Sequence, residues 1–149
     1  MMNRRDMLVG TGGAIAITLL PKPASATPEE MRMAVTRLFG DRPINDGRVS
    51  LKTPAIAENG NSVSVDIRVE SPMIEDDHVT QIALFAEANP LPDMIHCRLS
   101  PAMGEARLAS RVRLGDTQTI TAIAEMSDGT LWSGTAETVV TLAACVLIN

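Results

Sequence analysis

The residues with the most chemistry to offer are two cysteines, Cys97 and Cys145. A thiolate is a nucleophile that forms disulfide-like adducts with oxidised sulfur, and a second enzyme can cleave such adducts. Cys145 stands four residues from the C-terminus, where a thiol can serve as an attachment point without a catalytic base beside it. No Lys or Arg lies near it in sequence, and the terminal carboxylate disfavours a thiolate. We therefore expect the Cys145 thiol to react slowly in the isolated chain, and cationic groups to come from a partner.

A disulfide between the two cysteines is the alternative. Cys97 alternates with Ile95 and Leu99 along an expected strand, so its side chain should face the core as a small apolar group. Pairing requires Cα atoms within about 7 Å, and the separation along the chain does not decide this. Both states of Cys145, the free thiol and the disulfide, stay open at this point.

The other residue types give little basis for metal binding or catalysis. Two His and two Cys are too few for a structural zinc site, and the C-x-x-C-H spacing of an attached haem is absent from the sequence. His78 follows three acidic residues in an expected loop, and His96 lies beside Arg98 on the outward side of a strand, so we assign neither a role. There is no Ser-His-Asp order and no phosphate loop. We therefore expect no metal and no cofactor, and an enzyme in its own right is the third interpretation.

Cationic side chains form a stripe on one face of an expected strand. They are Arg107, Arg111 and Arg113, with Arg98 as an extension. Such a stripe can steer anions or dock a partner. We favour the alternative, a solvated sheet face whose arginines pair with acids such as Asp66 and Glu70 on other strands.

The composition limits which classes of protein these residues can serve. The chain has 149 residues with 13 basic and 18 acidic side chains, enough for one domain with a real core. It has one Trp, two Phe and no Tyr. A nucleic-acid binder usually needs a basic surface and stacking aromatic residues, so this class is excluded. Trp132, just after an expected turn, is predicted to anchor the core.

The first 26 residues have the pattern of an export signal. Arg4 and Arg5 precede an apolar stretch over residues 8–20, and Ala-Ser-Ala at 24–26 is a cleavage site that would leave Thr27 first. The stretch is shorter than the ~20 residues that span a bilayer, so no membrane anchor is expected. We favour a twin-arginine signal, which exports folded proteins, over a general secretory signal. Removal of residues 1–26 leaves 10 basic and 17 acidic residues, a net charge of −7.

One helix is expected directly after the signal. Thr27 can cap it, Pro28 suits its first position, and Glu30 completes a capping box. Met31, Val35, Leu38 and Phe39 follow at helical spacing, and residue 40, a glycine, can end the helix.

Strands are expected over the rest of the chain, because the apolar period changes to two. In residues 62–70, valine and isoleucine alternate with polar side chains, which is typical of a half-buried strand. Residues 127–130 (Ser-Asp-Gly-Thr) predict a hairpin turn. The expected strands cover residues 48–51, 62–70, 79–86, 95–100, 105–114, 118–126 and 131–142. About seven strands at regular spacing predict one antiparallel β-sandwich over residues 27–149, with a leading helix.

Four segments of this expected domain together resemble the SoxY family, the sulfur-compound carriers of the Sox thiosulfate-oxidation system. They are residues 47–51 (Gly-Arg-Val-Ser-Leu), 57–63 (Ala-Glu-Asn-Gly-Asn-Ser-Val), 70–73 (Glu-Ser-Pro-Met) and 124–129 (Ala-Glu-Met-Ser-Asp-Gly). The similarity runs from roughly Met31 to Cys145.

The resemblance implies an immunoglobulin-like sandwich and a periplasmic heterodimer with a second subunit, SoxZ. It further implies that Cys145 holds inorganic sulfur intermediates covalently. The partners implied are a haem cytochrome, which would load thiosulfate onto this cysteine, and a hydrolase, which would release sulfate from the bound intermediate. The resemblance favours a free Cys145. The runner-up is an exported structural or binding subunit in which Cys145 is disulfide-bonded or idle.

The C-terminal tail departs from the family pattern. Members place the cysteine between paired glycines, whereas residues 143–146 here read Ala-Ala-Cys-Val. Alanine and valine have less conformational freedom than glycine, so a swinging motion of the tail is in question. Residues 146–148 (Val-Leu-Ile) are apolar on both strand faces and should enter the core or dock on a partner.

Overall fold

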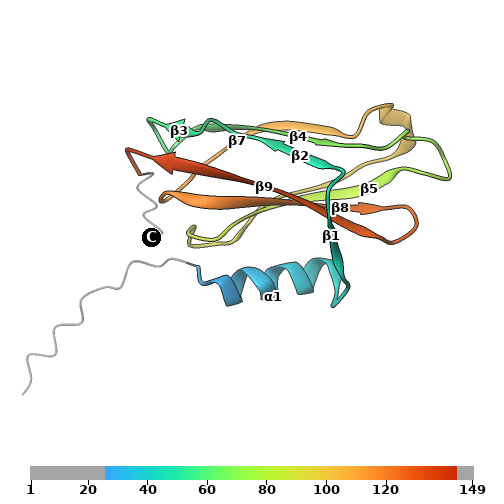
Figure 1. The fold of residues 1–149 in the computed structure, drawn as a ribbon, viewed down its shortest axis with the longest axis horizontal. Coiled ribbons are helices and arrows are strands. Elements are labelled where there is room, and N and C mark those ends of the chain that lie inside the picture. Colours follow the sequence, from blue (N-terminus) through green and yellow to red (C-terminus); the bar gives the residue numbers. More distant parts are fainter. Residues whose placement is uncertain (1–25, 144–149) are drawn as a thin grey trace, which may run out of the picture.

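A computed structural model describes residues 26–143 of the chain as a two-layered β-sandwich with one helix against its outer side (Figure 1). The expected export signal, apart from Ala26, and the expected carrier residue Cys145 lie outside the described residues. No helix in the described part is long and apolar enough to cross a membrane.

The helix α1 (Pro28–Phe39) begins and ends where the sequence predicts. The Thr27 hydroxyl accepts the backbone N–H of Glu30 at 3.2 Å, and the Glu30 carboxylate accepts that of Thr27 at 2.7 Å. Gly40 ends the helix at a φ of 76° and donates to the carbonyl of Thr36. Because both ends are fixed by short-range contacts, the sequence alone defined this element.

Within residues 26–143, nine strands form two sheets. The larger sheet has the order β1-β9-β8-β5-β6, with β3 beside β9, and the smaller has the order β2-β4-β7. The strands are β1 (Ile44–Asp46), β2 (Val49–Lys52), β3 (Ile56–Ala57), β4 (Val63–Val69), β5 (Val79–Ala86), β6 (Asp93–Arg98), β7 (Arg107–Val112), β8 (Gln118–Met126) and β9 (Leu131–Val140). The antiparallel immunoglobulin-like sandwich is confirmed, and β5 and β8 have the predicted bounds.

Two strands were missed, and five have other bounds than predicted, namely β2, β4, β6, β7 and β9. β1 and β3 hold three and two residues, too few for alternation, and both exist only because they pair in parallel with β9. β6 begins at Asp93 and ends at Arg98 because residues 101–103 form a short 3-10 helix, η1 (Pro101–Met103). β7 runs from Arg107 to Val112 and β9 ends at Val140, and bends follow within three residues of each of these two C-terminal ends.

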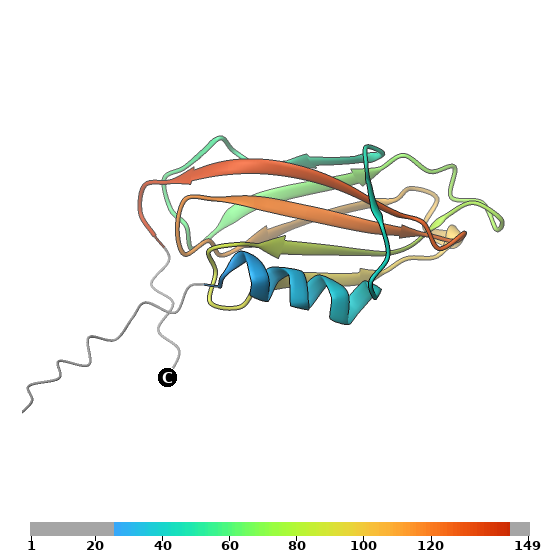
Figure 2. The ribbon, with the colours of Figure 1, turned by 60° about the horizontal axis from the view of Figure 1, so that its bottom comes forward.

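Two apolar clusters hold the layers together. The main core lies between the sheets and contains the inward side chains of β4, among them the fully buried Ile67. The second cluster lies between α1 and the outer face of the larger sheet (Figure 2), where Phe39 meets Phe85 edge-on at 6.5 Å. Trp132 is half-buried and packs against the main core, with the Arg48 guanidinium 4.9 Å from its ring centre.

Candidate functional site

The last strand carries the chain toward the expected carrier residue, and β3 fixes the end of this strand. β3 runs parallel to β9, with Ile56 opposite Val139. The Val139 N–H donates to the carbonyl of Ala55 at 2.9 Å, and the Thr141 N–H donates to that of Ala57 at 3.0 Å. The segment of β3 therefore holds β9 to its last residue and beyond.

Further hydrogen bonds extend this anchoring to Leu142. The Leu142 carbonyl accepts the N–H of Gly60 at 2.8 Å, and the Thr141 hydroxyl donates to the carbonyl of Glu58 at 3.2 Å. On the other side of β9, the Thr117 hydroxyl accepts the N–H of Val140 at 2.9 Å. The backbone is thus fixed until three residues before the carrier position.

Covalent geometry then limits where Cys145 can be. An extended chain spans at most about 3.3–3.6 Å per residue, so the Cα of Cys145 lies within about 10 Å of the Cα of Leu142. The sulfur chemistry expected of Cys145 must take place close to this end of the sandwich. The end of β9 and the beginning of α1 both lie at the left of Figure 1.

A buried amide pair, which the sequence reasoning missed, holds the loops at the same end. Asn89 is 8% exposed, and its side chain donates to the carbonyl of Arg113 at 2.8 Å and accepts the N–H of Gly115 at 2.9 Å. The side chain of Gln118, 6% exposed, donates to Asn89 at 3.0 Å and accepts the N–H of Ala88 at 2.8 Å. The only sequence signal at Asn89 was that of a loop, because a proline follows it.

The second cysteine lies on β6. Cys97 is half-buried, packs against the main core as predicted, and donates weakly from Sγ to the carbonyl of Arg98 at 3.7 Å. Within the described residues it is a free thiol. The free state of Cys145 stays a prediction, with the disulfide to Cys97 as its alternative, because Cys145 lies outside these residues.

His96 is exposed, as predicted, whereas His78 is half-buried. The His96 ring contacts the side-chain amide of Gln81 at 2.7 Å, and the His78 ring contacts the carbonyl of Ile74 at 3.2 Å. Among residues 26–143, no three His, Cys, Asp or Glu side chains come together in a way that could hold a metal ion.

The arginine stripe is partly neutralised. Arg107 donates twice to the carboxylate of Asp66, at 2.6 and 3.1 Å, and Arg68 lies 3.5 Å from the same group. The hydrogen bond from Arg107 holds the pKa of Asp66 below its usual value, and the carboxylate in turn raises the pKa of Arg107. The favoured interpretation, a solvated face with paired charges, is confirmed for this arginine.

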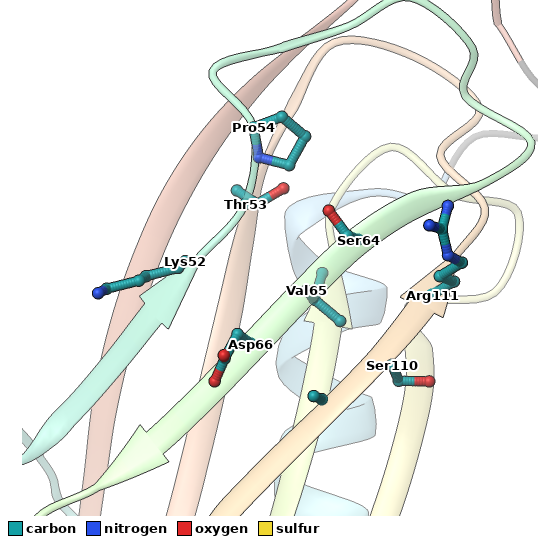
Figure 3. Close-up of a pocket in the computed structure, with 9 residues that line it drawn as sticks. Lys52, Thr53, Pro54, Ser64, Val65, Asp66, Ser110 and Arg111 are labelled. Carbon is teal, nitrogen blue, oxygen red and sulfur yellow. The ribbon is translucent and has the colours of Figure 1, made fainter.

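Arg111 differs from Arg107, because its guanidinium donates to the uncharged hydroxyl of Ser62 at 3.2 Å. Arg113, expected on the same strand, follows the end of β7. Arg111 lies at one side of a shallow hollow of about 610 Å³ on the outer face of the smaller sheet, and Lys52 lies at the other (Figure 3). The Asp66 carboxylate also lines the hollow, where its two arginine partners compensate its charge. This face of an otherwise acidic chain can attract anions.

The described residues therefore define an immunoglobulin-like β-sandwich that presents its C-terminal segment from one fixed end. Solved structures with this fold include a superoxide reductase (neelaredoxin) from Ignicoccus hospitalis, with a TM-score of 0.56 and 16% identity over 78% of this chain and 95% of that one. A putative superoxide reductase from Thermotoga maritima has a TM-score of 0.54 and 16% identity over 66% of this chain and 87% of that one. Identities this low show the shared fold alone.

A third structure is more similar. The sulfur carrier protein SoxY from Chlorobium limicola f thiosulfatophilum has a TM-score of 0.65 and 27% identity, over 76% of this chain and 98% of that one. The family model of the sulfur oxidation protein SoxY matches residues 35–145. None of the curated proteins matches the sequence. The chain belongs to the SoxY family, as the four sequence segments predicted.

Proposed function

We propose that this chain is a covalent sulfur carrier, not an enzyme, and that Cys145 is its point of attachment. The observation that carries the proposal is the match of the SoxY family model, which extends to residue 145 itself. The anchoring of β9 supports it, since the last fixed residue, Leu142, stands three positions before the thiol. A carrier needs an accessible thiol and no catalytic group of its own.

The attachment step can be written in balance. The Cys145 thiol and thiosulfate lose one proton and two electrons and form an S–S bond, giving a cysteine S-thiosulfonate. The electrons pass to the haem cytochrome that loads the carrier. A hydrolase then adds water across the terminal S–S bond, which releases sulfate and leaves a persulfide on Cys145. Both catalysts are partners of this chain, together with a SoxZ-like subunit in a heterodimer.

We further propose that the protein works in the periplasm after cleavage behind Ala26. The helix cap supports this site of cleavage, because Thr27 supplies both its hydroxyl and its N–H to Glu30. A mature chain that begins at Thr27 therefore keeps every group of the capping box.

Mass spectrometry of the mature protein tests the carrier function. The mature chain, its SoxZ-like partner, the loading cytochrome and thiosulfate should give an adduct with the mass of one thiosulfate. The adduct should vanish in Cys145→Ser and persist in Cys97→Ser, which is the matched control because Cys97 lies half-buried on β6. A wild-type chain that gains no mass overturns the proposal.

A further inference from the structure

Exposed apolar side chains gather where β3 meets the end of β9. Among the described residues, eight large apolar side chains are exposed. Two of them lie on these strands, Ile56 at 62% and Val139 at 43% exposed, and a third, Leu142 at 62%, follows the end of β9 by two residues. Ile56 and Val139 are direct partners in the parallel pairing. We call these three residues the β3–β9 tip.

The β3–β9 tip is preorganised for binding because its backbone is fixed by hydrogen bonds. Backbone hydrogen bonds from Val139 and Thr141 to the β3 segment, and from Gly60 to Leu142, fix the chain that carries these three side chains. Single exposed apolar residues are ordinary on protein surfaces, whereas a group beside a functional segment marks an interaction site. Contact with such a fixed surface costs little conformational entropy.

The short chain between Leu142 and Cys145 indicates which kind of partner covers this surface. The Cα of Cys145 lies within about 10 Å of that of Leu142. An enzyme that takes the Cys145 thiol into its active site must therefore bring the rim of that site against the end of the sandwich. The residues it meets there include the tip.

We propose that the β3–β9 tip is the docking surface for the cytochrome that loads thiosulfate onto Cys145. The rim of that enzyme's active site should be apolar, with positive charge beside it, because the exposed Glu58 and Glu137 flank the tip. This inference rests on the proposed carrier function and adds to it the contact that each loading event uses. The contact is small and transient, which suits a carrier that must leave each enzyme again.

Loading kinetics with matched variants test the proposal. The tip variant is Ile56→Thr/Val139→Thr/Leu142→Ser, in which threonine keeps the β-branched shape that strands favour. The control variant is Met33→Ser/Ile74→Thr/Met103→Ser. It changes three other exposed apolar residues, on α1, in the loop before β5 and on η1. Each heterodimer is titrated against the loading cytochrome with thiosulfate, and Cys145 is alkylated separately with iodoacetamide.

The tip variant should lose at least tenfold in kcat/KM for loading, while the control stays within twofold of wild type. Alkylation of Cys145 should stay within twofold in both, because a small reagent needs no docking. Equal loading of the tip variant and wild type overturns the docking surface alone. So does loss of co-elution of the tip variant with the SoxZ-like subunit, which would assign the tip to the permanent interface. A wild-type chain that is never loaded overturns the carrier function and this inference together.

Discussion

Replacement of Gly134 by alanine should destabilise the protein strongly, because β2 crosses β9 in close contact there. A Cβ on Gly134 would lie 2.2 Å from the carbonyl oxygen of Val49 and 3.0 Å from its carbonyl carbon. Both are backbone atoms and cannot rotate away. The two strands must separate locally, which weakens the packing between the sheets.

The expected cost is about 2–3 kcal/mol, in the upper part of the range for overpacked cores, because the clash is with backbone atoms. For a domain of this size each kcal/mol lowers Tm by about 3–5 °C, so Gly134→Ala should melt roughly 10 °C below wild type. Thermal unfolding followed by circular dichroism, together with urea titration, measures both quantities. The substitution should also loosen the end of β9. Thr53 directly follows β2, and its hydroxyl contacts the hydroxyl of the buried Thr138 on β9 at 3.0 Å.

Gly115→Ala is the matched control. A Cβ there would lie 3.7 Å from its nearest neighbours, which is ordinary contact, and the hydrogen bond from its N–H to Asn89 is kept. This variant should be as stable as wild type, or more stable by about 0.5 kcal/mol, since alanine restricts the unfolded chain. If Gly134→Ala lies within 0.5 kcal/mol of Gly115→Ala, the close approach of β2 and β9 is refuted.

Three further predictions concern other parts of the molecule. Asn89→Ala leaves several buried groups without partners and should cost about 2–3 kcal/mol in urea unfolding, whereas a loss below 0.5 kcal/mol would contradict the buried amide pair. The lowered pKa of Asp66 stabilises the folded state at pH values above the usual carboxyl range, and this contribution disappears as the pH falls through the folded pKa. Tm should therefore decrease less below pH 5 in Asp66→Asn than in wild type, and parallel curves would refute the role of Arg107. Thiol titration of the mature, denatured protein should count two thiols, while a count of zero would establish a disulfide between Cys97 and Cys145.

The parts of the fold that could be predicted from sequence are those fixed by neighbours in the chain. The capping box of α1 involves residues three positions apart, and the turn between β8 and β9 is encoded in four residues. β5 and β8 are long enough for their apolar pattern to define their ends. β3 has two residues and depends on β9, more than 80 positions away, so no local pattern indicates it.

The candidate site shows the same division. The ion pair between Asp66 and Arg107 was anticipated from the outward faces of two strands, but its geometry depends on register, since the residue opposite Asp66 is Ala109. The role proposed for Cys145 rests on membership of a family and not on the spacing of charges around it. The anchoring of Leu142 could not be predicted, because its partner Gly60 lies in a loop whose path only the folded sandwich determines.

Under the proposed carrier function, the anchoring of Leu142 restricts which enzymes can act on cargo at Cys145. Paired glycines would allow the backbone of the tail a wide range of φ and ψ angles. This chain instead has two alanines between Leu142 and Cys145. Three residues of chain therefore keep the Cα of Cys145 within about 10 Å of the fixed Cα of Leu142. The tail and the bound cargo together set how far into an active site the cargo can reach. A deeper active site can receive Cys145 only if the hydrogen bonds of Thr141 and Leu142 to the segment around β3 break. The partners of this carrier should accordingly have shallow active sites with rims that fit the end of the sandwich.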